Sequence, residues 1–285
     1  MRIRRMPARF PFPTGRRGGG VRRGGFKIWP IVLFALFFLY QYASKQETVP
    51  VTGRSQLIDV SKEQEAALGL MSYKDILAKE NIVTSGPEVD WIRSIGKKIA
   101  AVSGNTEFEW EFNLINSAQV NAFALPGGKV AVYTGILPVA KNDDGLAAIM
   151  GHEIAHAIAR HGAERMTHQK LVQFGTMAVG MSMSDMDFTT QKTVMGALGI
   201  GAQYGVLMPF SRSHESEADK IGLVFLAKAC FDPREAPKLW ERMGAANKGK
   251  APAEFMSTHP APETRIEQFK AWMPEAIKIK EEHCG

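Results

Sequence analysis

The sequence predicts an α+β fold that is mainly helical, with one small β-sheet and one transmembrane helix ahead of the globular part. Helical periodicity is clear in Glu88–Ser103, and it returns in segments towards the C-terminus. Alternation of apolar and polar residues, typical of short strands, occurs in Phe108–Ile115 and Val120–Leu137. Ile28–Ala43 is uncharged and mostly apolar. The length of 285 residues and the hydrophobic content of 45% allow one large domain or two small ones.

Residues 1–27 are predicted to form a disordered, basic, cytoplasmic arm. They contain nine Lys or Arg side chains and no acidic residue, and they are rich in Gly and Pro. Because the net charge of the whole chain is only +6, the remainder is acidic on balance. The basic charge therefore belongs to the arm, and we expect no nucleic-acid partner for the globular part.

Ile28–Ala43 is predicted to be a transmembrane signal-anchor. Its 16 residues are slightly fewer than the ~20 that a bilayer core needs, but Phe26 and a snorkelling Lys27 extend it. The positive-inside rule keeps the basic arm in the cytoplasm and sends the rest of the chain across the membrane. A cleaved signal peptide is the alternative, although no small-x-small cleavage site follows. Residues 44–60 are interpreted as a linker to a domain over residues 61–285.

The chemistry is predicted from Gly145–Gly162, which reads GLAAIMGHEIAHAIARHG. His152 and His156 are four positions apart, so on a helix both imidazoles project from one face and can share a metal ion. Glu153 lies about 100° to the side and suits a general base for a zinc-activated water. A buried His pair in an ordinary helix is the alternative, so the prediction depends on a third ligand.

That ligand is predicted from Ser213–Leu223, where Glu215 and Asp219 are again four positions apart. If this helix crosses the first, Glu215 can bind the metal while Asp219 accepts a hydrogen bond from the outer nitrogen of a ligand His. Glu217 points away from Glu215 and is expected at the solvated surface. His214 is expected to be a neighbour rather than a ligand.

The metzincin arrangement of three histidines is excluded by spacing. It requires Gly at position 159 and His at position 162, whereas the chain has Ala159 and Gly162. His161 projects about 140° away from His156 on the helix. We therefore expect His161 to have a structural role or to contact a ligand without binding the metal.

The two β-like runs of Val120–Leu137 are joined by Pro126-Gly127-Gly128, which predicts a hairpin. One of its strands could be a sheet edge beside the helix of His152 and align an extended peptide through main-chain hydrogen bonds. Further upstream, Ser61 and Gln64 have the spacing of a capping box, which predicts a helix.

Leu171–Pro209 is rich in Gly and Met. Two helices packed over the helix of His152 are the preferred interpretation, and a mobile lid or a membrane-facing surface is the alternative. Cys230 and Cys284 lack zinc-finger spacing, and the sequence leaves open whether they pair.

Three separated motifs together resemble one family of metallopeptidases. HEIAHAIARHGAER is followed by SRSHESEADKIGL and then by STHPAPETRIEQ, a series similar to the gluzincin family typified by the CAAX prenyl protease and HtpX. The resemblance covers roughly Ser61–Gly285, and one anchor with one soluble domain resembles the periplasmic BepA/LoiP/Oma-like branch. It implies a zincin-like fold with a small β-sheet beside the HExxH helix. The multi-spanning architecture of the prenyl proteases is not seen in the sequence, which argues against a CAAX substrate.

Carried over position by position, the resemblance implies one Zn²⁺ per chain. The residues it implies are the zinc ligands His152, His156 and Glu215, the general base Glu153, the orienting residues Asp219 and Arg265, and the substrate-aligning residues Asn121 and Ala122. It also implies that His259 can approach the metal from a C-terminal segment, where it would control access or stabilise an oxyanion.

The resemblance implies a membrane-anchored zinc-dependent endopeptidase at the inner membrane, with a cytoplasmic N-terminus and a periplasmic catalytic domain. The expected partners are unfolded or misassembled envelope and membrane proteins, which the enzyme would remove in quality control. A chaperone-like assembly factor with secondary proteolysis is the alternative from another class. A purely structural zinc, closed by a fourth ligand such as His259, is disfavoured because Glu153 adjoins the first His and no Cys lies near the motif.

Overall fold

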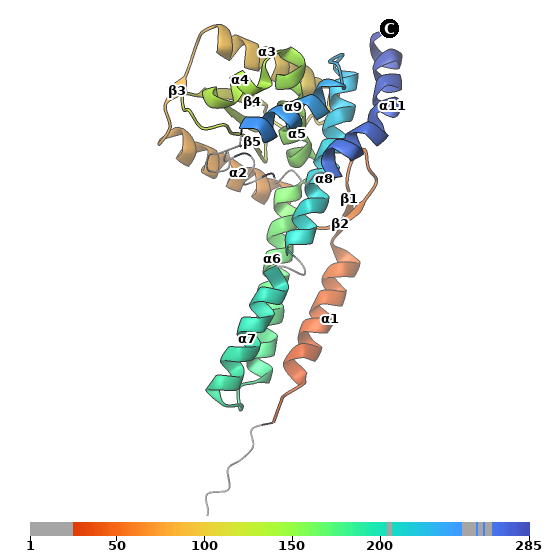
Figure 1. Ribbon diagram of the computed structural model, residues 1–285. Coiled ribbons are helices and arrows are strands. Elements are labelled where there is room, and N and C mark those ends of the chain that lie inside the picture. The colour runs from red at the N-terminus through yellow and green to blue at the C-terminus, as the bar shows by residue number, and fades with distance from the viewer. Residues whose placement is uncertain (1–24, 204–206, 247–254, 256–258, 260–263) are drawn as a thin grey trace, which may run out of the picture.

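The computed structural model describes residues 25–203, 207–246, 255, 259 and 264–285 of the chain (Figure 1). The predicted basic arm of residues 1–27 lies outside the described residues except for its last three. Within the described part the fold is α+β and mainly helical, as the sequence predicts.

In the described residues, one 3₁₀ turn, η1 (Thr134–Ile136), precedes α4. The helices are α1 (Trp29–Ser44), α2 (Lys62–Leu77), α3 (Pro87–Val102), α4 (Leu137–Ala140), α5 (Asp143–Ile158), α6 (His161–Ser182), α7 (Phe188–Ala202), α8 (Met208–Lys228), α9 (Glu235–Ala246) and α11 (Thr264–Cys284). The strands are β1 (Gln46–Thr48), β2 (Ser55–Leu57), β3 (Ile82–Val83), β4 (Glu111–Ile115), β5 (Ala122–Leu125) and β6 (Lys129–Tyr133).

The larger sheet has the strand order β3-β4-β6-β5, so β5 is an edge strand. β5 and β6 form the predicted hairpin, whose turn uses Gly127 and Gly128 at φ values of +86° and +87°. α3 and α5 pack on one face of this sheet, and Ile76 of α2 packs on the other. The edge strand therefore runs beside α5 with its outer side free of sheet partners among the described strands.

α5 is the central helix, and nearly all of its residues are buried. The side chain of Asn142 caps it by accepting a hydrogen bond of 2.8 Å from the backbone N–H of Gly145. α8 packs along α5 at close range, because Gly151 faces Gly222: a Cβ on Gly222 would lie only 3.0 Å from the backbone nitrogen of His152. The two glycines thus bring the backbone of α8 against the helix that carries the HExxH motif.

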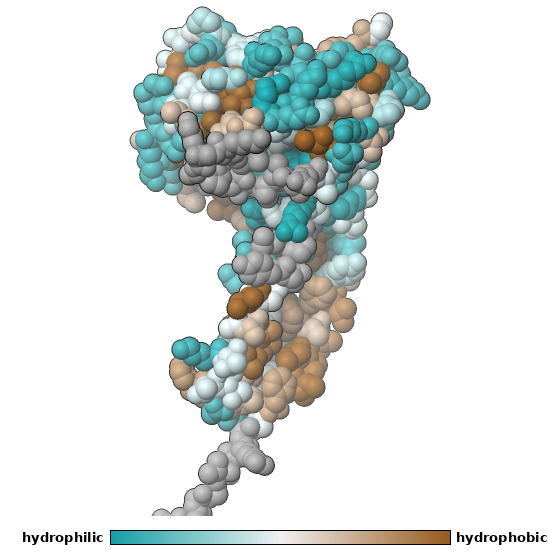
Figure 2. Space-filling model, viewed as in Figure 1, coloured by the Kyte–Doolittle hydropathy of each residue, from teal (hydrophilic) through white to brown (hydrophobic). Residues whose placement is uncertain are grey.

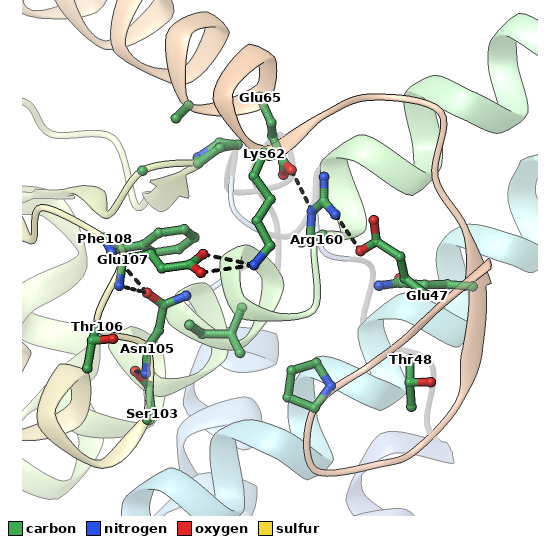
Figure 3. Close-up of a pocket in the computed structure, with 17 residues that line it drawn as sticks. Glu47, Thr48, Lys62, Glu65, Ser103, Asn105, Thr106, Glu107, Phe108 and Arg160 are labelled. Atoms are coloured by element: carbon green, nitrogen blue, oxygen red, sulfur yellow. Dashed lines mark hydrogen bonds and ion pairs between the residues drawn. The ribbon is translucent and has the colours of Figure 1, made fainter. Parts of the chain in front are cut away.

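Residues 44–60, expected as a linker, contain the antiparallel β1–β2 hairpin. Arg160, in the left-handed conformation at φ +58° after α5, joins this hairpin to the domain. Its guanidinium donates to Glu47 of β1 and, at 2.7 Å, to Glu65 of α2, as Figure 3 shows. The β1–β2 hairpin, α2 and the end of α5 border a polar pocket of about 370 Å³. The side chain of Lys62 also projects into it (Figure 3). The capping box predicted for α2 is present.

α1, α6 and α7 lie side by side and project from the rest of the molecule; we call these three helices the stem (Figure 1). The interpretation of Leu171–Pro209 as two helices covering α5 is therefore wrong: α7 packs against α6, and none of its described residues is buried. Gly175 of α6 allows α1 to pack closely on α6, since a Cβ there would lie 3.2 Å from the ring of Phe34 of α1. Among the described helices, none is long and apolar enough to cross a membrane. The span predicted over Ile28–Ala43 is thus a helix but is not confirmed as a transmembrane one.

The C-terminal helix α11 packs along α8. A disulfide between Cys230, just after α8, and Cys284, at the end of α11, joins the two helices and settles the pairing that the sequence leaves open. The two cysteines are 54 positions apart.

Replacing Cys230 and Cys284 together by Ser should lower the free energy of unfolding by about 2–4 kcal/mol, because the disulfide restricts the unfolded chain. Denaturant unfolding of the full chain in detergent, followed by circular dichroism, measures this. Reductant should shift the midpoint of the parent protein to that of the variant and leave the variant unchanged. Equal midpoints in all four samples would contradict the prediction.

Candidate metal centre

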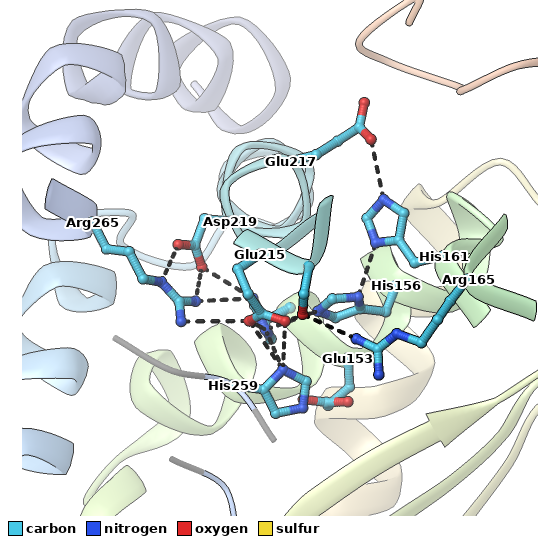
Figure 4. A network of polar contacts seen from close by, with 11 residues as sticks. Glu153, His156, His161, Arg165, Glu215, Glu217, Asp219, His259 and Arg265 are labelled. Carbon is cyan, nitrogen blue, oxygen red and sulfur yellow. Dashed lines mark hydrogen bonds and ion pairs between the residues drawn. The ribbon is translucent and has the colours of Figure 1, made fainter. Parts of the chain in front are cut away.

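Four potential ligands meet at one point between α5, α8 and the segment before α11. His152, His156, Glu215 and His259 each offer a nitrogen or oxygen atom, and these atoms all lie within 4.8 Å of one another. The Nε2 atoms of the two helical histidines are 3.1 Å apart, and Glu215 reaches both of them at 3.3 and 3.5 Å (Figure 4). His259 lies with its Nδ1 3.0 Å from Glu215.

The chemistry of these groups fits a metal ion. Two imidazole nitrogens and one carboxylate are a donor set that zinc uses in catalytic sites. His152 and Glu215 are almost completely buried, and burying such a cluster without a cation would place lone pairs against one another. His259 offers a fourth donor from the opposite side. The structure thus brings together the histidines of the predicted His152–His156 helix and Glu215 of the predicted crossing helix.

Glu153 lies beside the cluster but does not join it. Its side chain is 3% exposed, and its Oε1 has no hydrogen-bond partner among the described residues. Nε2 of His259 is 3.5 Å from that oxygen. Burial raises the pKa of the Glu153 carboxyl, while the charges of His259 and His152 and the backbone of Ala124 on β5 act in the opposite direction. A buried carboxylate oxygen with no partner is suited to accept a proton from a small molecule bound next to it.

Asp219 and Arg265 contact the candidate ligands His152 and Glu215 on the side that faces away from the cluster. Asp219 lies 3.0 Å from Nδ1 of His152, the nitrogen that faces away from the cluster. Arg265, at the start of α11, donates to both oxygens of Asp219 at 2.5 and 2.6 Å, and its Nη1 is 3.5 Å from Glu215. The guanidinium also stacks on the ring of Trp240 at 3.6 Å. The sequence expectation for both residues agrees with where the structure places them.

A second chain of contacts leads outward from His156. Its Nδ1 is 2.8 Å from Nδ1 of His161, and Nε2 of His161 is 3.1 Å from Glu217 (Figure 4). Glu217 also accepts a hydrogen bond of 2.8 Å from Arg54. The expectation that Glu217 is solvated surface is therefore wrong: its side chain is 8% exposed. The N-terminal hairpin supplies the cation that makes its burial possible, and helix geometry alone could not show this.

The pKa values of His156 and Glu215 suit the binding of a cation, whereas that of His152 does not. Burial lowers the pKa of His156 well below its ordinary value, so the imidazole is neutral. Burial would raise the pKa of Glu215, but hydrogen bonds with His152 and His259 hold it far below its usual range. For His152, burial is outweighed by hydrogen bonds with Asp219 and Glu215, which raise its pKa to about 9. A metal ion binding here displaces that proton.

Asn121 and Ala122 lie at the start of the edge strand. Ala122 is the first residue of β5 and is buried, and its N–H donates to the side chain of Asn121 at 2.9 Å. The carbonyl of Asn121 accepts from the N–H of Tyr133 on β6. Both residues thus stabilise the strand, while Ala124 is the β5 residue whose backbone interacts with Glu153. The sequence reasoning did not single out Ala124, because only the packing of β5 on α5 shows which residue faces Glu153.

The family model for Peptidase family M48 matches residues 88–273, a span that contains every candidate ligand. The chain belongs to Peptidase family M48. Membership in M48 makes the chain a zinc metalloendopeptidase. It also agrees with the gluzincin resemblance of the three sequence motifs.

Curated M48 relatives include mitochondrial and bacterial proteases. The chain is 39% identical to the mitochondrial metalloendopeptidase OMA1 of Schizosaccharomyces pombe over 249 residues, which are 85% of this chain and 71% of the relative. It is 36% identical to the OMA1 of Saccharomyces cerevisiae, covering 85% of this chain and 73% of the relative. It is 28% identical to the beta-barrel assembly-enhancing protease of Escherichia coli over 79% of this chain, and it spans about half (47%) of that relative.

Replacing Asp219 by Asn should weaken zinc binding by about 10- to 100-fold, because the amide no longer balances Arg265 or fixes the ring of His152. Competition with a chromophoric chelator measures the affinity. Glu235→Gln is the matched control, since Glu235 is also a buried carboxylate, paired with Arg242 at 2.6 Å, but lies away from the cluster. An equal loss of zinc in both variants would show a general effect of buried charge instead.

Proposed function

We propose that this M48 protein is a membrane-anchored, zinc-dependent endopeptidase that removes misfolded or misassembled envelope or membrane proteins. The observation that carries the catalytic part is the convergence of His152, His156 and Glu215 beside a buried Glu153 whose Oε1 accepts no hydrogen bond from the described residues. A purely structural zinc site would not need a buried carboxylate oxygen that lacks a hydrogen-bond partner next to it.

His152, His156 and Glu215 would hold the metal. Zinc held there would supply a water molecule with a pKa lowered towards ~7 and a charge that polarises a peptide carbonyl. Glu153 accepts the proton of the attacking water at Oε1 and then donates it to the leaving amide nitrogen. Asp219, through His152, and Arg265 keep the ligand set in place while charge develops.

The substrate backbone would lie along β5, whose outer side is free of strand partners in the described part of the chain. An extended peptide can add to such an edge by main-chain hydrogen bonds, which do not depend on side-chain identity. Because Ala124 of β5 interacts with Glu153, a peptide bond aligned on this strand lies next to the general base. This arrangement suits an enzyme that acts on unfolded segments rather than on one fixed sequence.

His259 would act at the mouth of the centre. Its Nδ1 is 3.0 Å from Glu215 and its Nε2 3.5 Å from Glu153, so the imidazole lies where a substrate carbonyl would have to enter. We propose that it gates access or, once displaced, stabilises the oxyanion. The proposed roles of Asn121 and Ala122 are to fix the start of the substrate-aligning strand.

The proposed location is supported by the composition of the N-terminal region and by the relatives. α1 would anchor the chain in the inner membrane, with the basic residues before it in the cytoplasm and the catalytic part in the periplasm or an equivalent compartment. The presence of a disulfide supports an oxidising compartment. The names of the relatives, a mitochondrial metalloendopeptidase and a beta-barrel assembly-enhancing protease, support a task in maintaining membrane or envelope proteins.

The test of the catalytic assignment is Glu153→Gln in the full chain. The variant should keep one zinc and the parent melting temperature but lose casein cleavage by at least about 100-fold, because the amide cannot accept the proton. Zinc content, thermal melting and casein cleavage are compared with those of the parent. Turnover comparable to that of the parent would remove Glu153 from its assigned role.

The alternative, a chaperone-like assembly factor with secondary proteolysis, makes a different prediction for the same variant. A proteolytic function requires that cells carrying only Glu153→Gln accumulate misassembled envelope proteins, as a deletion strain does. Full restoration of envelope assembly by the inactive variant would favour the chaperone-like function.

A further inference from the structure

The stem presents apolar side chains to its surroundings on all three of its helices. Figure 2 shows this apolar surface below the polar catalytic part. The exposed large side chains include Leu33, Leu36 and Leu39 on α1, Met177 and Met181 on α6, and Phe188, Leu198 and Ile200 on α7. α1 and the Leu171–Ser182 half of α6 contain no charged residue, and the single charged residue of α7 is Lys192. Apolar surface of this extent on a soluble domain marks a binding surface.

Polar groups are gathered at the tip of the stem. Nζ of Lys27 is 2.9 Å from Asp185 in the turn between α6 and α7, and the backbone N–H of Lys27 donates to the carbonyl of Ser182. Asp187 caps α7 in the same turn. Trp29 lies next to this tip, whereas Tyr40 and Tyr42 lie at the other end of α1. An apolar band between a charged, Trp-bearing end and a Tyr-bearing end is the pattern of a segment placed in a lipid bilayer.

The contact between α1 and α6 leaves an apolar groove of about 250 Å³ that is open to the outside. It is lined by Trp29, Leu33, Phe37, Phe174, Met177 and Met181. A groove with flexible Met side chains and no charged lining residue suits an alkyl chain.

We propose that the α6–α7 hairpin enters the lipid bilayer together with α1, so that the whole stem is a membrane element. The proposal rests on the proposed anchoring by α1 and extends it to a part of the chain that follows the HExxH motif. The occupant of the apolar surface is the acyl-chain region of the membrane. The catalytic part is then held at the membrane surface by three helices rather than by one flexible tether.

Fluorescent labelling at single introduced cysteines tests this in the full-length protein. The chain has two cysteines, both in the disulfide, so Leu198→Cys on α7, Leu36→Cys on α1 and Met71→Cys on α2 each provide one reactive thiol. Leu198, Leu36 and Met71 are all exposed. Each labelled protein is reconstituted into phosphatidylglycerol–phosphatidylethanolamine vesicles that contain acyl-chain spin-labelled lipid.

We expect strong quenching at positions 36 and 198 and little at position 71. Quenching at 36 without quenching at 198 would overturn the proposal for the hairpin and leave the anchor intact. If neither label is quenched, the proposed anchoring of the chain by α1 is overturned as well. Protection of position 198 from an aqueous quencher without lipid quenching would point to a second copy or an apolar substrate on the hairpin, and it would also overturn the proposal.

A separate observation concerns the chain of contacts from His156 to the N-terminal hairpin. His161 lies between His156 and Glu217, and all three side chains are buried or half-buried. Glu217 in turn accepts from Arg54 and from the hydroxyl of Thr52, which precede β2. This path therefore connects a metal ligand with the turn of the hairpin that follows α1.

The order of atoms along the path determines which nitrogen of His156 carries a proton. A carboxylate can only accept, so Nε2 of His161 carries the hydrogen that it donates to Glu217. In a neutral ring, Nδ1 of His161 is then an acceptor, and it lies 2.8 Å from Nδ1 of His156. His156 must donate there, which leaves its Nε2 with a free lone pair facing the cluster.

We infer that His161 and Glu217 are positioning residues that fix His156 in the tautomer able to bind the metal. Asp219 performs this task for His152, so each helical ligand has its own acceptor. The acceptor of His156 is His161, which is oriented by Glu217. Glu217 in turn is held by Arg54 and Thr52 of the N-terminal hairpin. Displacement of the N-terminal hairpin would therefore weaken the metal site through His156 alone.

The variant Glu217→Leu tests the relay, with Glu164→Leu as the matched control. Glu164 is a buried carboxylate that accepts from Arg54 at 2.7 and 2.8 Å, but its histidine partner is His214, which is not one of the clustered donors. Each full-length variant is titrated with zinc against a chelator, and its Co²⁺ form is examined by visible absorption. Glu217→Gln, which keeps an acceptor oxygen, serves as the conservative variant.

Glu217→Leu should bind zinc about 10- to 100-fold more weakly and show an altered Co²⁺ spectrum, whereas Glu164→Leu and Glu217→Gln should resemble the parent. Equal weakening in Glu164→Leu, or an unchanged affinity in Glu217→Leu, would overturn the inference. If Glu217→Leu does not fold, His161→Phe removes both nitrogens at nearly constant size and gives the same comparison.

Discussion

The contact between α5 and α8 is the constraint on which the rest of the molecule depends. Two glycines face each other where the helices touch, and a Cβ at Gly222 would lie 3.0 Å from the backbone of His152. Only at this separation can a Glu side chain from α8 reach both imidazoles of α5. Larger side chains would separate the helices, and the carboxylate would no longer meet both rings. The metal centre is therefore a product of helix packing before it is a product of ligand identity.

Placing so many carboxylates in the interior has a second consequence: several of them are paired with a cation from another part of the chain. Asp219 is paired with Arg265 from α11, and Glu217 and Glu164 share Arg54 from the N-terminal hairpin. Glu65 is paired with Arg160. The charges that surround the centre thus join the first and last segments of the chain to its middle. Folding of the catalytic part is cooperative for this electrostatic reason as well as through its apolar core.

Much of this arrangement could be predicted from local pattern. Helical spacing placed His152 and His156 on one face, the capping box located the start of α2, and Gly127-Gly128 marked the turn of the β5–β6 hairpin. These features depend on residues close together in the sequence. The pairing of Glu215 with the two histidines required only one further assumption, that two helices cross.

The features that could not be predicted depend on contacts between residues far apart in the sequence. Glu217 was expected at the surface because its position on α8 points away from Glu215, and nothing near it in the sequence shows that Arg54 meets it. The segment Leu171–Pro209 was expected over α5 because its apolar residues suggest burial. Apolar composition does not distinguish a protein core from an exposed surface, and only the direction in which α6 leaves α5 shows that this segment does not cover α5 (Figure 1).

The disulfide also has a consequence for the chemistry of oxidation. Both cysteines of the chain are bonded to each other, and the candidate ligands of the described centre are nitrogen and oxygen donors, which mild oxidants attack less readily than thiolates. The side chains open to such oxidants are methionines: Met71 of α2 is 59% exposed, and Met177 and Met181 of the stem are 57% and 46% exposed. Conversion of a thioether to a sulfoxide makes it polar. Oxidative damage would therefore act on the exposed methionines of α2 and of the apolar stem before it reaches the candidate zinc ligands.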